Sequence, residues 1–188
     1  MIFSTTTFLL YFLPLFFFIY YSAPIRFKNI IILGGSIIFY SWGAPKFIFV
    51  VLIATYLDFY IVKKLHATYR IKARKALLSL SIFINLGLLV YFKYANFFVE
   101  NLNVLFSYFD LNPMGWTHVF LPIGISFYTF QTLTYSIDVY RKKAKPLDNV
   151  SDYMLYIMSF PQMIAGPIVR FNSIASQIIN REECFDDK

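Results

Sequence analysis

The sequence predicts an all-α, polytopic membrane protein with about five transmembrane helices, an interfacial amphipathic helix and a re-entrant or kinked segment. Hydrophobic residues make up 59% of the chain and charged residues only 14%, whereas about a quarter of an ordinary soluble domain is charged. The charged residues also separate long uncharged runs, including 1–25, 29–45, 76–92 and 111–137. The shortest of these four would form a helix of about 25 Å, which is near the minimum for crossing a bilayer.

Five apolar segments are long enough to be considered as spans. In chain order they cover residues 3–23, 30–42, 47–62, 76–92 and 119–140. The second contains Gly34, Gly35 and Ser36, small residues that let a neighbouring helix approach closely. The spacing of a phosphate-binding loop is absent around these glycines, so we interpret them as a packing surface.

A segment with a different pattern follows the fourth span. Asn96, Glu100, Asn103 and Ser107 fall on one helical face, and the opposite face is apolar. The apolar face consists of Phe97, Phe98, Leu102, Leu105 and Phe109. This pattern predicts a helix that lies in the membrane interface rather than crossing the bilayer.

Basic residues are distributed unevenly between the loops. The segments 24–29, 63–75 and 141–149 would lie on one side of the membrane and together carry twelve Lys and Arg residues. The loops on the other side carry only Lys46 and Lys93. The positive-inside rule then places the N-terminus outside, and it attributes the net charge of +7 to topology rather than to nucleic-acid binding.

The apolar run near the C-terminal end cannot form one regular helix. Pro161 lacks a backbone donor, and Gly166-Pro167 introduces a second break. Irregular backbone at membrane depth is tolerated only where protein buries it or where it lines a wet cavity. We therefore interpret residues 159–170 as a re-entrant or kinked element beside a cavity.

Polar residues within the expected spans are the candidates for chemistry. Gln131, Thr134 and Asp138 share one helical face, which would form either the wall of a substrate passage or a set of hydrogen bonds between helices. For Gln131 the sequence supports the two interpretations equally. For Asp138 it favours an interfacial ion pair with Arg141 or Lys142. Asp58 precedes Lys63 by less than two helical turns, which favours an interfacial ion pair there too.

Histidine and cysteine give no further candidate. His66 and His118 are scattered in loops without a neighbouring acid and nucleophile, so we expect neither a metal site nor a catalytic residue in this chain. Cys184 is interpreted as a surface thiol in the polar tail 180–188, and residues 1–179 are expected to form a single membrane domain.

Three ordered runs carry a resemblance to a known family. They are LPIGISFYTFQ at 121–131, YSIDVYR at 135–141 and FPQMIAGPIVR at 160–170, and YFKYANFF at 91–98 also fits. These runs resemble the membrane-bound O-acyltransferase family, in particular its bacterial branch of alginate O-acetyltransferases and D-alanyl-transfer proteins.

The resemblance implies a tunnel through a thinned bilayer of the bacterial inner (cytoplasmic) membrane. An activated acyl donor, acyl-CoA or acyl carrier protein, would supply an acyl group from the cytoplasmic side, with acetyl as the first expectation. The acceptor would be a hydroxyl of a cell-envelope or extracellular polysaccharide, often with a periplasmic or extracellular partner protein. No bound cofactor is expected. The candidate residues of the tunnel are Gln131, Thr134, Asp138, Pro161, Gln162, Gly166, Pro167 and Arg170.

The sequence departs from the family in one respect. The histidine thought to activate the accepting hydroxyl belongs to a later part of family members, and neither His66 nor His118 matches its position. The chain therefore resembles the N-terminal part of such an enzyme, and we expect it to be inactive alone. Two alternatives stay open, a non-catalytic membrane scaffold and a transporter-like subunit, although a transporter would be expected to repeat the broken segment.

Overall fold

The structure is a computed structural model that describes residues 5–109, 111–122, 124–165 and 171–179. Within these residues it is helical and contains no strand, which confirms the all-α class. A π-helical turn, η1 (Phe8–Phe12), precedes eight α-helices. They are α1 (Leu13–Ser22), α2 (Ile25–Gly43), α3 (Ile48–Ala67), α4 (Ile71–Tyr108), α5 (Ile125–Tyr140), α6 (Val150–Met158), α7 (Phe160–Ala165) and α8 (Phe171–Ile179).

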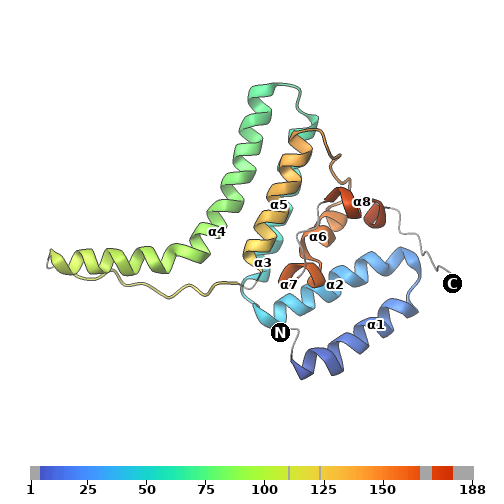
Figure 1. Ribbon diagram of the computed structural model, residues 1–188, viewed down its shortest axis with the longest axis horizontal. Coiled ribbons are helices and arrows are strands. Elements are labelled where there is room, and N and C mark those ends of the chain that lie inside the picture. Colours follow the sequence, from blue (N-terminus) through green and yellow to red (C-terminus); the bar gives the residue numbers. More distant parts are fainter. Residues whose placement is uncertain (1–4, 110, 123, 166–170, 180–188) are drawn as a thin grey trace.

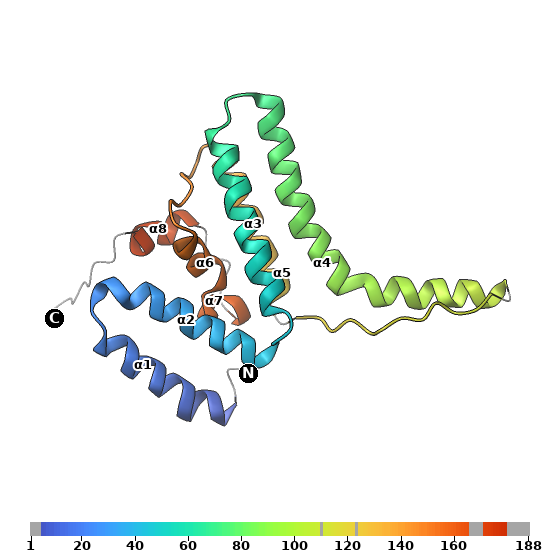
Figure 2. The same ribbon diagram turned by 180° about the vertical axis from the view of Figure 1, so that it is seen from behind.

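The helices form two groups that meet along α6. In Figure 1, α3, the first half of α4 and α5 stand side by side, while α1 and α2 run as a neighbouring pair on the other side. The short helices α6, α7 and α8 lie between these groups, and Figure 2 shows the same arrangement from behind. Four tyrosines, Tyr128, Tyr135, Tyr153 and Tyr156, are among the largest fully buried side chains at this junction.

The expected spans and the observed helices agree in order but differ in length. One described helix, α4, is long and apolar enough to cross a membrane by itself, and Phe8–Ser22 is a shorter apolar stretch. The count of about five spans therefore stays a prediction. The start of the fifth expected span is wrong, because α5 begins at Ile125 rather than at residue 119. Gly124, the N-cap residue of α5, has φ 82°, a left-handed conformation that favours glycine.

The predicted amphipathic helix is the second half of α4. Both views show α4 bending and projecting away from the other helices, with the chain returning along it (Figures 1 and 2). Asn96 holds the returning chain, donating to Val119 O at 2.7 Å and accepting from Val119 N at 2.9 Å. Asn103 Oδ1 accepts from Met114 N at 2.7 Å in the same way. Two residues of the predicted polar face therefore bind the segment 111–122.

The close packing predicted for the small residues of α2 is confirmed at Gly35 but not at Gly34. A Cβ added at Gly35 would lie 2.8 Å from the ring of Phe16 on α1, whereas one added at Gly34 would meet nothing within 4 Å. The ring of Phe16 in turn lies edge-on to Phe160 of α7, with centroids 5.2 Å apart. Gly35 thus allows α1 to approach α2 and, through Phe16, the start of α7.

Candidate functional site at the break between α6 and α7

The predicted irregular segment is broken at Ser159. Helix α6 ends at Met158, α7 begins at Phe160, and Ser159 between them has φ −53° and ψ 115°, which is not helical. Pro161 is the second residue of α7, a position where its missing N–H is tolerated. This is one of the two predicted breaks. The second candidate break, Gly166-Pro167, and the candidate Arg170 lie outside the described residues.

Side chains from two other helices satisfy the backbone at the break. In an unbroken helix Phe160 N would donate to Tyr156 O. Here Phe160 N donates to Ser36 Oγ of α2 at 3.1 Å, and Tyr156 O accepts from Gln131 Nε2 of α5 at 2.8 Å. The break is therefore built into the packing of α2 and α5, as the cost of unpaired backbone groups in an apolar environment requires.

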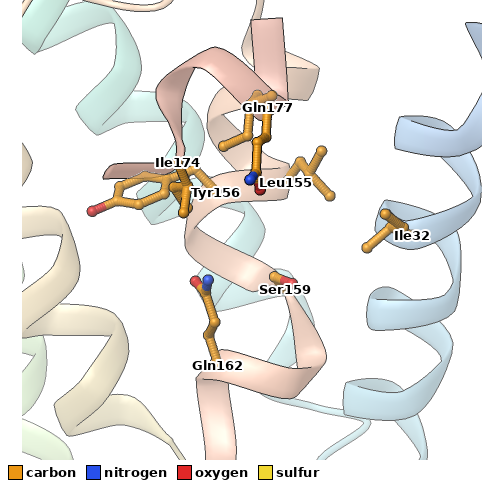
Figure 3. A pocket seen from close by; sticks show the side chains of 8 residues that line it. Ile32, Leu155, Tyr156, Ser159, Gln162, Ile174 and Gln177 are labelled. Carbon is orange, nitrogen blue, oxygen red and sulfur yellow. The ribbon is translucent and has the colours of Figure 1, made fainter. Parts of the chain in front are cut away.

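A cavity of about 130 Å³ lies beside this break. Its lining comes from α2, α6, α7 and α8 and consists of Ile32, Leu155, Tyr156, Ser159, Gln162, Ile174, Gln177 and Ile178. Figure 3 shows the amide groups of Gln162 and Gln177 directed toward the cavity from opposite ends. Such a volume holds several water molecules, which need polar partners of this kind. The cavity that the broken backbone predicted is therefore present.

An apolar groove of about 620 Å³ lies next to the cavity and is lined by Phe8, Leu9, Leu13, Phe16, Phe17, Tyr20, Ile32, Ser159, Phe160 and Pro161. It shares Ile32 and Ser159 with the polar cavity. The break therefore adjoins one space lined by both polar and apolar side chains and another that is almost wholly apolar. This is an arrangement that suits a group with a polar end and an apolar end.

The candidate residues of the tunnel separate into two sets. Gln131 is buried and also donates to Gln162 Oε1 at 3.1 Å, so these two candidates lie together at the break with Pro161. Thr134 instead donates to the carbonyl oxygen of Gln131 in its own helix at 2.9 Å. Neither Thr134 nor Asp138 lines the cavity or the groove. The predicted polar face of α5 is therefore not a continuous wall of these two spaces.

The ion pair expected for Asp138 is wrong. Its side chain is half-buried and forms no salt bridge with Arg141 or Lys142 in the part of the chain that the structure describes. Its main-chain carbonyl instead accepts from Lys143 N at 2.9 Å and Ala144 N at 3.3 Å, which closes the C-terminal end of α5.

A second polar cluster was not predicted, and Asp58 is its centre. Ser81 Oγ and Asn85 Nδ2 of α4 donate to Asp58 Oδ1 at 2.5 and 3.1 Å. Tyr153 Oη of α6 and Ser136 Oγ of α5 donate to Oδ2 at 2.6 and 3.4 Å. Asp58 is only 1% exposed, so one carboxyl group joins α3, α4, α5 and α6.

The ion pair expected between Asp58 and Lys63 is therefore wrong. Lys63 Nζ donates to the carbonyl oxygen of Asp148 at 3.2 Å. The signal for the Asp58 cluster was the pair Ser81 and Asn85, four residues apart on one face of an apolar span.

The histidines lie apart from both clusters. His66 lies near the C-terminal end of α3, and His118 lies in the returning segment, where its ring meets Phe120 at a centroid distance of 5.7 Å. Among the described residues no group of three or more His, Cys, Asp or Glu could hold a metal ion. The break presents amide groups beside a small cavity, and such groups can bind a ligand through hydrogen bonds.

Comparison with known proteins identifies relatives along nearly the whole chain, although no family model and no solved structure matches it. The chain is 38% identical to the probable alginate O-acetylase of Azotobacter vinelandii over 187 residues, 99% of this chain and 38% of that protein. The corresponding protein of Pseudomonas putida is 40% identical over 187 residues, 99% of this chain and 39% of its own length.

A more distant relative has a different named activity. The peptidoglycan O-acetyltransferase of Helicobacter pylori is 28% identical over 207 aligned residues, covering 94% of this chain and 38% of that protein. The chain thus spans somewhat more than a third of the length of the curated relatives it matches. The relatives are named as O-acetylases and O-acetyltransferases, which agrees with the resemblance of the sequence to the membrane-bound O-acyltransferase family.

Proposed function

We propose that this chain forms part of an O-acyltransferase that passes an acyl group, with acetyl expected, across the membrane to hydroxyls of a cell-envelope or extracellular polysaccharide. The observation that carries the proposal is the break at Ser159, where Gln131 and Gln162 meet beside a polar cavity. The names of the relatives support an O-acetyl product and a polymer acceptor, since they specify alginate and peptidoglycan.

The distribution of polar and apolar side chains supports a location within the membrane. Buried side chains include Asp58, Asn85 and Gln131, whereas large apolar side chains such as Phe18 and Phe83 are 72% and 76% exposed. Lipid favours this arrangement, because exposed apolar groups cost nothing there and polar groups need protein partners. We therefore propose a multi-pass protein of the bacterial inner membrane with about five spans and the N-terminus outside.

The cavity and groove beside Ser159 are the proposed acyl passage. Gln131, Pro161 and Gln162 are its candidate residues among those described, and Gly166, Pro167 and Arg170 are candidates by resemblance. The acyl donor, an acyl-CoA or an acyl carrier protein, would approach from the side of the basic loops. A periplasmic or extracellular partner protein would receive the acyl group or present the acceptor.

The decisive experiment is a chimera. This chain would replace the matching 187 residues of the Azotobacter vinelandii protein, and the acetyl ester content of alginate would be measured in cells that lack the native protein. We expect acetylated alginate from the chimera. The variant Gln162→Leu removes the partner of Gln131 and one of the two amide groups that line the cavity. Acetylation should therefore fall at least about tenfold, the effect of losing about 1.4 kcal/mol of transition-state stabilisation.

The control variant is Thr129→Val, since Thr129 is buried in α5 and donates to Ile125 O within its own helix. It should retain most of the acetylation. A chimera that accumulates in the membrane without acetylating alginate would contradict the proposal and would favour the non-catalytic scaffold.

The chain by itself is expected to transfer no acyl group, because the resemblance assigns the family histidine to a part of the enzyme that this chain does not match. Incubation of the purified chain with a labelled acyl donor and a polysaccharide acceptor tests this expectation. Turnover above the background of the host membrane would contradict it. A transporter-like subunit would instead move the labelled group across a vesicle membrane without ester formation.

A further inference from the structure

A second cavity, lined largely by polar residues, lies at the C-terminal end of α5. It measures about 410 Å³ and is lined by His66, Thr68, Tyr69, Arg74, Lys142, Ala144 and Lys145. These residues come from the turn between α3 and α4 and from the chain that follows α5, which meet at the top of Figure 1. Three lysine or arginine side chains and one histidine line the cavity, and none of the described residues in its lining is acidic.

Arg74 is held in place but retains an unused donor. Its Nη2 donates to the carbonyl oxygen of Tyr140 at 2.6 Å, and its guanidinium lies 5.1 Å from the centroid of the Tyr140 ring. Its Nε is buried and has no hydrogen-bond partner among the described residues. Arg74 also lines the cavity, so this fixed guanidinium group is available to an oxyanion ligand there.

Lys142 occupies a backbone position that favours glycine. Its φ is 59°, and the turn is closed by Lys142 N donating to Val139 O at 3.1 Å and Lys143 N donating to Asp138 O at 2.9 Å. This is the Schellman end of a helix, in which the left-handed residue is usually glycine. A lysine here adopts an unfavourable conformation that also places it in the cavity lining, and such strain is concentrated at functional sites.

Helix dipoles explain only part of the positive charge around the cavity. Cations are favourable near the C-terminal ends of α3 and α5, which explains the position of Lys142. Arg74, however, is in the first turns of α4, where the dipole opposes a positive charge. A bound anion would remove this conflict.

We propose that this cavity binds a phosphate group carried by a larger molecule, either a soluble organic phosphate or the headgroup of an anionic phospholipid. Arginine and lysine donors around one small cavity suit tetrahedral oxyanions, and Tyr69, which is 97% exposed, provides a ring at its rim. The assignment of this group to the acyl donor rests on the proposed function, whereas binding of phosphate does not.

The test measures binding to the purified chain in nanodiscs of phosphatidylcholine. Pyrophosphate is the soluble probe, followed by titration calorimetry, and phosphatidylglycerol is the lipid probe, followed by native mass spectrometry. The double variant Lys142→Gly, Lys145→Gln removes two charges from the cavity, and glycine keeps the left-handed turn. The control Lys72→Gln, Lys75→Gln removes two charges from the first turns of α4 that do not line the cavity.

We expect at least one probe to bind the parent chain. The affinity of the cavity variant should be at least about tenfold weaker, because charge-assisted hydrogen bonds are strong, and that of the control variant should lie within about twofold of the parent. Loss of pyrophosphate binding alone identifies a soluble phosphate, and loss of phosphatidylglycerol binding alone identifies a lipid. Binding of neither probe to the parent, or equal weakening in both variants, would overturn the proposal. Helical content measured by circular dichroism confirms that each variant is folded.

Discussion

The two buried polar clusters use hydrogen bonds in different ways. In the Asp58 cluster, side chains of α3, α4, α5 and α6 bond to one carboxyl group, and the cluster lines neither the cavity nor the groove beside Ser159. In the cluster at the break, Ser36 and Gln131 bond to main-chain atoms of a non-helical segment, beside a cavity. The first cluster fixes how helices pack, whereas the second keeps a helix interrupted.

This difference indicates which of the two clusters is expected to contain functional residues. An intramembrane carboxyl group is a functional candidate by default, yet Asp58 is enclosed by four donors from the protein itself. Gln131 carries no charge, but its amide maintains irregular backbone next to a space that a substrate could enter. Substitutions at Asp58 should therefore affect folding, and substitutions at the break should affect the passage more than folding.

The largest expected effect is that of Asp58→Ala. The buried carboxyl group that joins four helices is lost and Tyr153 Oη loses its acceptor, whereas Ser81, Ser136 and Asn85 each keep a second acceptor. Loss of the centre of this buried hydrogen-bond network should destabilise the chain by about 3–5 kcal/mol. Unfolding of the purified chain, followed by circular dichroism in mixed micelles of increasing denaturing-detergent content, measures this loss. In the chimera, the same variant should lower the amount of protein in the membrane.

Asp58→Asn is the matched control for this prediction. It keeps the shape of the side chain but exchanges one acceptor oxygen for a donor, so a smaller loss of about 1–3 kcal/mol is expected. If Asp58→Ala were as stable as the parent chain, the Asp58 cluster would not be the structural centre that its hydrogen bonds indicate.

The order of the helices could be predicted from the sequence, and the position of Asp58 could not. The expected third span ended at residue 62, but α3 continues to Ala67, so Asp58 lies deeper in the helix than expected. Residues five apart also point to different faces of a helix, which separates Asp58 from Lys63. The partners of Asp58 lie 23 to 95 residues away in the sequence, and only the packing of the helices brings them together.

The break, unlike the Asp58 cluster, could be predicted from the sequence because its cause is local. Pro161 and the requirement for paired backbone groups are visible in the sequence, and they led to the cavity beside residue 159. Gln131 was assigned equally to a passage wall and to bonds between helices, and the structure gives it bonds to α6 and α7 beside the cavity. The role of Ser36 was missed, since nothing in the run Gly34-Gly35-Ser36 indicates a partner 124 residues away.

An intermediate effect is expected for Gln131→Leu. Tyr156 O would lose a donor in a buried site, which costs about 1–3 kcal/mol, and Gln162 would lose its partner. Hydrogen exchange should increase in α6 and α7, while the helices around Asp58 stay protected. Gln131→Met supplies the matched variant, because it keeps the length of the side chain but removes the donor, and it should loosen the same segment. Uniform loosening of the whole chain would remove the distinction between the two clusters.

The smallest expected effect is that of a substitution in α2 that disturbs the packing of α1 beside the break. Gly35→Ala would place a methyl group 2.8 Å from the Phe16 ring, and that ring packs against Phe160. The ring can shift in part, so the expected destabilisation is about 1 kcal/mol, at the low end for overpacking. Gly34→Ala adds the same methyl group where nothing lies within 4 Å, and it should be neutral or stabilise the helix by up to about 1 kcal/mol. A stability difference between the two variants, with faster exchange at α7 only in Gly35→Ala, would show that α1 helps to hold the break. Equal stability would mean that Ser36 and Gln131 maintain the break without support from α1.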